Sequence, residues 1–341
     1  MSYRRYLIGR LLLFPVAAVT VVSITFFLLN LVPTDVARAL AGDFATPQQV
    51  QDVRHQLGLD KPLGQRYVLY MEGLIVRGDL GTSYLTNSPV RQQLLSRLPS
   101  SLELIVPGML IATLLGVTMG TAGAYYSGRA PDRVSRIFVS VLQSMPEFLL
   151  ALLLIYVVFF LLRLVPAPLG QLGPVASAPP TRTGFLIVDA LIAGQWSVAG
   201  SALYHLVLPM LVIGLAFSTS LARVARTAVA NALESPYIVF ARACGLSERQ
   251  VVRYALLDAR TPLLTYLAIL AGNIIGSAAI VELIFNWQGA GQWAISAALN
   301  YDMPSVLGFV AFGAVTTMAA YFILDIVAAA LDPRITYRAA R

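Results

Sequence analysis

Six long apolar stretches constrain the fold of this chain more than any other feature of its sequence. A helix needs about 20 apolar residues to cross the hydrocarbon core of a bilayer. The stretches cover approximately residues 7–32, 102–127, 137–162, 203–222, 261–284 and 305–331. Only 12% of the residues are charged, whereas a soluble domain has about 25%. The sequence therefore predicts an all-α membrane protein with six transmembrane helices.

The arginine distribution predicts the orientation of these spans. Fifteen basic residues lie before the first span, between the second and third, between the fourth and fifth, and after the sixth. Short loops rich in Lys and Arg remain in the cytoplasm. Both termini and the 223–260 loop are therefore expected to be cytoplasmic, and the 163–202 loop external. Membrane anchoring also accounts for the net charge of +7, so no nucleic-acid partner is expected.

A small external subdomain is predicted for residues 33–101. It follows residues 1–32, which are expected to form an N-terminal cytoplasmic segment and the first span, and it precedes a membrane core of residues 102–341. Thr46 and Gln49 have the spacing of a capping box, and Gly58 is suited to end the helix that the box begins. A second apolar-periodic run, residues 67–76, ends at Gly78. Within the 163–202 loop, one short helix is expected near residues 185–192.

Residues 235–258 have the pattern of two short helices with a sharp joint. Ser235 can cap the first helix, and Pro236 suits its first turn. Gly245 is suited to the left-handed turn that ends it, and Ser247 with Gln250 forms a capping box for the second. Helices this short need packing to be stable, so a helical hairpin held by contacts is predicted.

The hairpin, with Pro262 after it, resembles the cytoplasmic EAA loop of ABC importer permeases of the dipeptide, oligopeptide and nickel branch. The matching residues are Tyr237, Ala241, Arg242, Ala243, Gly245, Leu246, Ser247, Val251, Ala255, Leu256 and Pro262. Cys244 stands where this branch usually has lysine, and Tyr254 where it usually has histidine. Further matching segments are 57–62, 78–84, 205–209, 282–291 and 331–334, so the resemblance covers nearly the whole chain.

The resemblance implies a type I ABC importer permease, a multi-pass protein of the bacterial cytoplasmic (inner) membrane that carries dipeptides or oligopeptides. Relatives with similar motifs carry nickel or glutathione-like solutes. The implied partners are a homologous second permease, two ABC ATPase subunits, an external substrate-binding protein and the lipid bilayer. The residues expected to couple to the ATPase are Tyr237, Ala241, Arg242, Gly245, Leu246, Ser247, Val251 and Ala255. A solvated hairpin without a partner is the alternative.

Three polar residues are candidates for a gate or cavity. Glu282 and Asn286 lie near the outer end of the fifth span, before a glycine-rich segment that can bend. Glu147 is the third, because a carboxylate within a membrane often has a function. A position at the cytoplasmic boundary or in a polar cavity explains Glu147 equally well. Asp325, in the sixth span, has a similar status.

Catalysis by this chain is not expected. His55 and His205 are far apart and have no cysteine partner, which argues against a metal site or a Ser–His hydrolase. A phosphate-binding P-loop needs a lysine after its glycines, and the single lysine, Lys61, lacks that context. ATP and Mg are therefore expected on partner subunits, with no cofactor in this chain. The main alternative is a stand-alone secondary transporter, which usually has more spans and repeated halves; an intramembrane enzyme is the second.

Overall fold

The structure is a computed structural model that describes residues 3–31, 35–42, 44–173 and 177–331. These residues form helices and connecting loops, without a named strand among them. The elements are α1 Tyr3–Leu31, α2 Val36–Ala41, α3 Pro47–Gln56, α4 Leu63–Glu72, η1 Gly73–Arg77, α5 Val90–Tyr125, α6 Ala130–Gln143, α7 Glu147–Leu154, η2 Ile155–Leu161, α8 Leu186–Ile192, α9 Trp196–Leu233, α10 Pro236–Ala243, α11 Glu248–Ile284, α12 Ala290–Leu299 and α13 Met303–Leu331. Most of the predicted closing motif, 331–334, lies outside the described residues.

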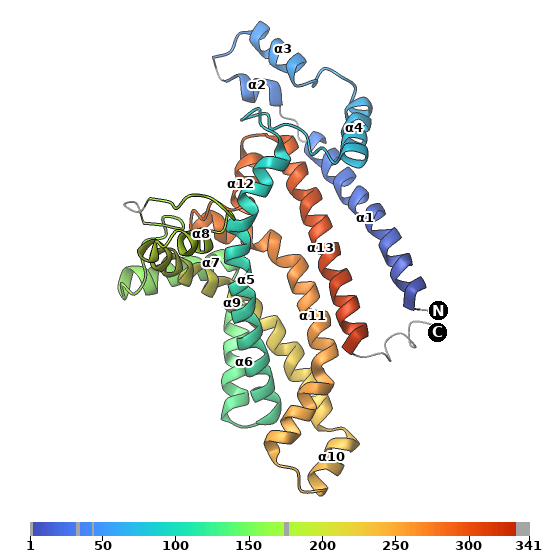
Figure 1. The fold of residues 1–341 in the computed structure, drawn as a ribbon, viewed down its shortest axis with the longest axis vertical. Coiled ribbons are helices and arrows are strands. Elements are labelled where there is room, and N and C mark those ends of the chain that lie inside the picture. The colour runs from blue at the N-terminus through green and yellow to red at the C-terminus, as the bar shows by residue number, and fades with distance from the viewer. Residues whose placement is uncertain (1–2, 32–34, 43, 174–176, 332–341) are drawn as a thin grey trace.

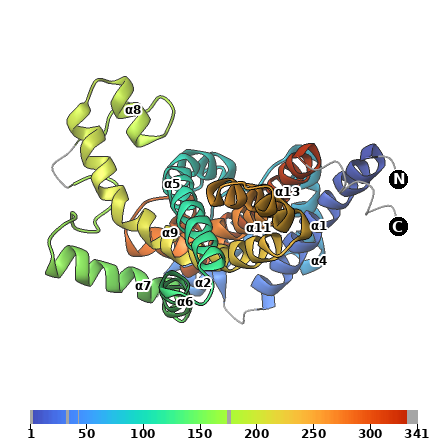
Figure 2. The ribbon, with the colours of Figure 1, turned by 90° about the horizontal axis from the view of Figure 1, so that it is seen from below.

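Five of these helices are long and apolar enough to cross a membrane: α1, α5, α9, α11 and α13. A sixth span exists if the bent pair formed by α6 with α7 and η2 is taken as one. The predicted all-α architecture with up to six spans is therefore confirmed. Figure 2 shows α5, α9 and α11 in the middle, α1 and α13 on one side, and α7 and α8 on the other.

The third span differs from its prediction. Instead of one helix over 137–162, the chain bends by 104° between Gln143 and Glu147. Pro146 has no N–H to donate, and it disfavours the helical conformation for Met145 before it. The first helix therefore ends at Gln143 and a new one begins at Glu147. In Figure 1, α6 runs beside the lower part of α5, whereas α7 points away from the bundle.

Close packing of α5 on α9 forms the centre of the bundle. Gly116 and Gly120 of α5 lie against α9 so tightly that an added Cβ would collide, at Gly116 with Leu221 and at Gly120 with the Ala222 carbonyl. Small residues let helix backbones approach in this way. Side chains of α11 complete the two main apolar clusters, one toward each end of this pair. The central helices thus form one packed unit.

Three predicted loops are shorter than expected because the helices continue past the apolar windows. α5 begins at Val90 rather than at 102, and α9 spans residues 196–233 rather than 203–222. The second helix of the 235–258 hairpin is not a separate short helix, because it is the first part of the 37-residue helix α11. Most of the 223–260 loop is therefore helical.

The segment after α1 folds as short helices above the end of the bundle (Figure 1). The predicted capping box forms, since Gln49 accepts a hydrogen bond from the Thr46 N–H (2.8 Å) and Thr46 accepts one from the Gln49 N–H (3.3 Å). Tyr67 packs against Phe26 of α1 and shares a hydrogen bond of 2.7 Å with Ser23. We call residues 35–89 the subdomain and the opposite end, which carries α10, the hairpin end.

The loop between η2 and α9 is organised by two carboxylates. Asp189, in the predicted short helix α8, accepts hydrogen bonds from the N–H groups of Arg182, Thr183 and Gly184 at 2.8–3.1 Å. Burial raises the pKa of Asp189, but these bonds and the Thr183 hydroxyl outweigh it and lower the pKa to about 2. Glu103 of α5 accepts the Ile187 N–H at 2.8 Å and so fixes α8 to the bundle.

Candidate functional site: the hairpin and the turn after α11

The hairpin, residues 235–258, begins where the sequence predicts. Pro236 occupies the first turn of α10, and Ser235 precedes it in an extended conformation. The predicted side-chain cap is wrong, however, because the Ser235 hydroxyl donates to the Ala232 carbonyl at 2.5 Å and no side-chain cap bond to α10 forms. Ser235 therefore joins the end of α9 to the start of α10.

The joint between α10 and α11 has the predicted geometry. Gly245 has φ +82°, a conformation that strains residues with a side chain. An added Cβ at Gly245 would meet no atom of the described chain within 4 Å. Glycine is therefore required here by the backbone conformation and not by a lack of space. Gln250 accepts hydrogen bonds from the N–H (2.9 Å) and hydroxyl (2.8 Å) of Ser247, which fixes the start of α11.

A forked ion pair closes the hairpin across this joint. The Nε and Nη2 atoms of Arg242 donate to the two carboxylate oxygens of Glu248 at 3.1 and 3.3 Å. Glu248 also lies near Tyr125 at the end of α5. The joint is therefore fastened within the hairpin, although the pair itself is exposed.

The predicted coupling residues fall into three groups by exposure. Val251 and Ala255 are fully buried, like Ile238, and they hold the hairpin against the bundle. Tyr237, Arg242, Gly245 and Ser247 are exposed, whereas Ala241 and Leu246 are half-buried. The exposed group can contact a partner directly, and the buried group can only shape the hairpin.

Sequence reasoning missed several exposed apolar side chains on the hairpin. Phe240 is 70% exposed and Val239 59% exposed, and Tyr254 and Leu257 are about half exposed. Like Tyr237, they lie beyond the apolar windows, where a soluble surface carries polar groups. Exposed apolar patches of this kind mark sites of protein contact. The sequence signal for this exposed surface is the presence of apolar residues beside Arg242 and Arg253, outside the predicted spans.

Arginines of α6 and α9 also hold the hairpin end together through one carboxylate. Asp132 of α6 is buried and accepts hydrogen bonds from the Gly128 N–H and from Arg226 of α9, both at 3.0 Å. Arg136 approaches the same carboxylate at 3.4 Å. Because α9 leads directly into α10, this cluster ties α6 to the base of the hairpin.

Of the gate candidates, Glu282 is buried near the end of α11. Its carboxylate accepts the Gln292 N–H at 2.9 Å, in the first turn of α12, where a negative charge is favoured. Asn286 is exposed, with φ +50°, and accepts a bond of 2.9 Å from the Gln292 side chain. The structure thus places the two residues on opposite sides of one turn.

That turn is locked to α5 by polar contacts inside the bundle. The Trp287 indole N–H donates to the Ser100 carbonyl at 2.9 Å, and the Ser100 hydroxyl donates to the Trp287 carbonyl at 3.2 Å. The Ser101 hydroxyl accepts the Ala290 N–H at 2.8 Å. A mostly apolar cavity of about 280 Å³ borders the turn, and Glu282 forms part of its wall.

Glu147 lies apart from this turn, in the first turn of α7 directly after the 104° bend. It is half-buried and forms no hydrogen bond or ion pair with the described residues. The side chain of Asp325 lies outside the described residues. His55 bonds Asp60 and His205 bonds the Ser201 carbonyl, both at 2.8 Å, so the structure does not bring the histidines together.

Comparisons with known proteins identify the family of this chain. The family described as "Binding-protein-dependent transport system inner membrane component" matches residues 112–337, and its N-terminal companion family matches residues 3–105. A probable D,D-dipeptide transport system permease protein of Escherichia coli K12 is 36% identical over 92% of each chain.

Two further relatives align over almost their full length. A dipeptide transport system permease protein of Alkalihalophilus pseudofirmus is 32% identical over 97% of this chain and 99% of its own. A glutathione transport system permease protein of Salmonella choleraesuis is 31% identical over 98% and 99%. The chain therefore belongs to the family of inner membrane components of binding-protein-dependent transport systems.

Proposed function

We propose that this chain is a membrane-spanning permease subunit of an ATP-driven importer for dipeptides or oligopeptides. The observation that carries the coupling part of this proposal is the hairpin, which exposes apolar side chains and is continuous with a helix long enough to span a membrane. The peptide cargo is supported by the names of the relatives, two of which are dipeptide permeases and one a glutathione permease. Glutathione is itself a small peptide.

The proposed assembly contains a homologous second permease, two ABC ATPase subunits and an external substrate-binding protein in the bacterial inner membrane. ATP and Mg would be bound by the ATPase subunits, with no cofactor held by this chain. The termini and the hairpin end would lie in the cytoplasm, and the subdomain outside. The family description supports a binding protein and an inner-membrane location, and the arginine distribution supports the orientation.

In the proposed mechanism, the hairpin acts as a lever. ATP binding would bring the two ATPase subunits together. Each ATPase subunit would displace the permease hairpin that is docked on it. The Arg242–Glu248 pair and the Ser247–Gln250 contacts keep the hairpin in shape. Because α11 continues from the joint to the turn at Glu282, displacement of its first residues would tilt the helix as a body. Alternating access then follows from rigid movement between two states with different contacts.

A bulky residue at the joint tests the docking claim. Gly245→Trp places an indole in the open space that a partner would occupy, and it also strains the positive φ. We expect normal membrane insertion but loss of substrate uptake and of ATPase co-purification. Gly194→Trp is the matched control, since Gly194 also has a positive φ and open space but lies beside α8.

The outcomes separate the proposed function from its alternative. Normal substrate uptake by the Gly245→Trp variant would contradict the proposal that the joint docks on an ATPase subunit. Uptake driven by an ion gradient in vesicles without ATP would instead establish a secondary transporter. Equal loss in both tryptophan variants would show general damage from a strained bulky residue, which also contradicts a specific role for the joint.

A further inference from the structure

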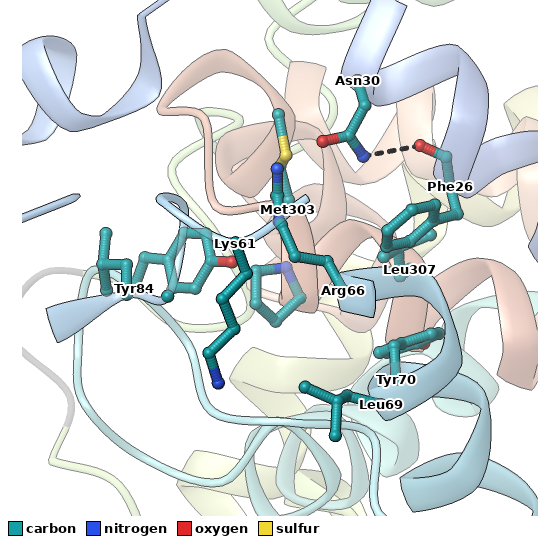
Figure 3. Close-up of a pocket in the computed structure, with 12 residues that line it drawn as sticks. Phe26, Asn30, Lys61, Arg66, Leu69, Tyr70, Tyr84, Met303 and Leu307 are labelled. Atoms are coloured by element: carbon teal, nitrogen blue, oxygen red, sulfur yellow. Dashed lines mark hydrogen bonds between the residues drawn. The ribbon is translucent and has the colours of Figure 1, made fainter. Parts of the chain in front are cut away.

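A pocket with a basic rim lies between the subdomain and the membrane helices. It has a volume of about 200 Å³ and is lined by the end of α1, the start of α13 and the segment from Leu57 to Tyr84. In Figure 3, Lys61 and Arg66 lie between Tyr84 on one side and Phe26, Leu307 and Tyr70 on the other. The pocket thus combines two basic side chains with aromatic and apolar walls.

The polar groups of this pocket are incompletely paired within the described part of the chain. Arg66 lies near Tyr84, and neither Arg66 nor Lys61 forms a salt bridge with a described carboxylate. The Tyr70 hydroxyl is buried and has no hydrogen-bond partner there. A buried hydroxyl without a partner is costly, so this arrangement suits a ligand that supplies acceptor oxygens.

The position of the pocket at the ends of two membrane spans indicates a ligand from the lipid bilayer. The apolar span of α1 covers Leu13–Leu31 and that of α13 begins at Met303, so the pocket lies where both spans reach the membrane boundary. Only 11% and 17% of these two spans are buried in the structure, against 44% for α9 and α11. Both spans therefore expose most of their surface in this chain, although Phe26 and Leu307, which line the pocket, are themselves buried. Tyrosines at this depth are typical of the membrane–water interface.

We propose that this pocket binds the headgroup of an anionic phospholipid. The phosphate would lie against Arg66 and Lys61, which attract anionic headgroups, and the Tyr70 hydroxyl would donate to a phosphate oxygen. The glycerol and the first methylenes would cover Leu69 and Met303, which line the pocket and are at least partly exposed. Bound in this way, the lipid joins the subdomain to α1 and α13. The proposal is independent of the cargo and of the ATPase.

Lipid binding to the purified importer complex tests the site directly. The complex is delipidated in detergent and titrated with phosphatidylglycerol, and bound lipid is counted by native mass spectrometry. We expect at least one tight site that prefers phosphatidylglycerol to phosphatidylcholine. Lys61→Gln with Arg66→Gln should weaken it about tenfold or more, since each basic residue near a membrane surface contributes to attraction.

Three further variants distinguish a loss of lipid binding at the pocket from a general loss of charge or of folding. Arg91→Gln removes an exposed charge of the same sign outside the pocket and should leave the tight site unchanged. Arg66→Lys keeps the charge and should retain binding, which separates lipid contact from folding. The single variant Lys61→Gln changes an exposed side chain and provides a folded test if the double variant is unstable.

Three results would overturn the assignment. One is equal phosphatidylglycerol affinity in the double variant and Arg91→Gln. Another is displacement of the lipid by inorganic phosphate at equal concentration, which would show a site for the free anion. The third is protection of residues 57–70 from hydrogen exchange by the external binding protein but not by phosphatidylglycerol, which would show a protein contact.

Discussion

At the scale of single residues, several buried carboxylates fasten helix ends. Asp302 is the clearest case: it accepts hydrogen bonds from the Ser83 hydroxyl (2.5 Å), the Tyr84 N–H (2.9 Å) and the Ser305 hydroxyl (2.7 Å). This contact explains the 78–84 motif as a structural one that fixes the subdomain loop to the start of α13. Asp132 fastens the hairpin end in a similar way.

The sequence could identify contacts only where both partners are close in the chain. The Thr46–Gln49 box and the turn at Gly245 follow from neighbouring residues, and both are present. Asp302 and Ser83 are 219 positions apart, and Asp132 and Arg226 are 94 apart. No local pattern pairs them, because the packing of α5, α9 and α13 brings them together.

Asp132→Asn should loosen the hairpin end. It removes the charge that Arg226 and Arg136 face, while an asparagine oxygen can still accept the Gly128 N–H. Hydrogen bonds to charged groups are worth about 1.5–3 kcal/mol, so we expect a loss of about that size. Thermal unfolding of the purified protein in detergent measures it.

Arg136→Gln is the control for that change. Arg136 is exposed and its contact with Asp132 is longer, so we expect a loss below about 1 kcal/mol. Equal destabilisation by the two variants would contradict the assignment of Arg226 as the main partner.

At the scale of elements, the central feature is that the hairpin and the fifth span share one helix. The predicted spans end where the arginines begin. Residues 223–260 are therefore predicted as a loop, although α9 and α11 both extend into this segment. Hydropathy does not reveal the bend before Glu147, because residues 137–162 are apolar on both sides of it. Pro146 was the local signal of that break.

A flexible insertion into α11 tests the lever. Two glycines inserted after Asp258 interrupt the helix between the hairpin and the membrane, because glycine disfavours helix and adds flexibility. We expect the hairpin to bind its partner and ATP hydrolysis to continue, with substrate uptake reduced at least tenfold. Uptake per ATP hydrolysed, in reconstituted vesicles, is the measurement.

The same insertion between Pro179 and Pro180 is the control, because those residues lie in a loop. It should leave the uptake ratio unchanged. An unchanged ratio for the α11 insertion would show that transport does not require continuity of this helix.

At the scale of the whole molecule, the structure has surfaces of different character at its two ends. The hairpin end exposes Phe240 and Val239, whereas the subdomain end has the basic pocket around Arg66. Between them, α5, α9 and α11 form the packed centre, flanked by α1 and α13, whose apolar spans are mostly unburied in this chain (Figure 2). Family membership and the exposed hairpin together indicate that this chain functions as one part of an assembly.

Photo-cross-linking from the hairpin in native membranes tests the central claim most directly. Phe240 is replaced by p-benzoyl-phenylalanine, a conservative change at a 70% exposed position, and the products are identified by mass spectrometry. Phe44, fully exposed on the subdomain, takes the same substitution as the control. The account predicts a cross-link to an ATP-hydrolysing subunit from position 240 and none from position 44. Absence of that subunit from the products at 240, or its equal recovery at 44, would contradict it.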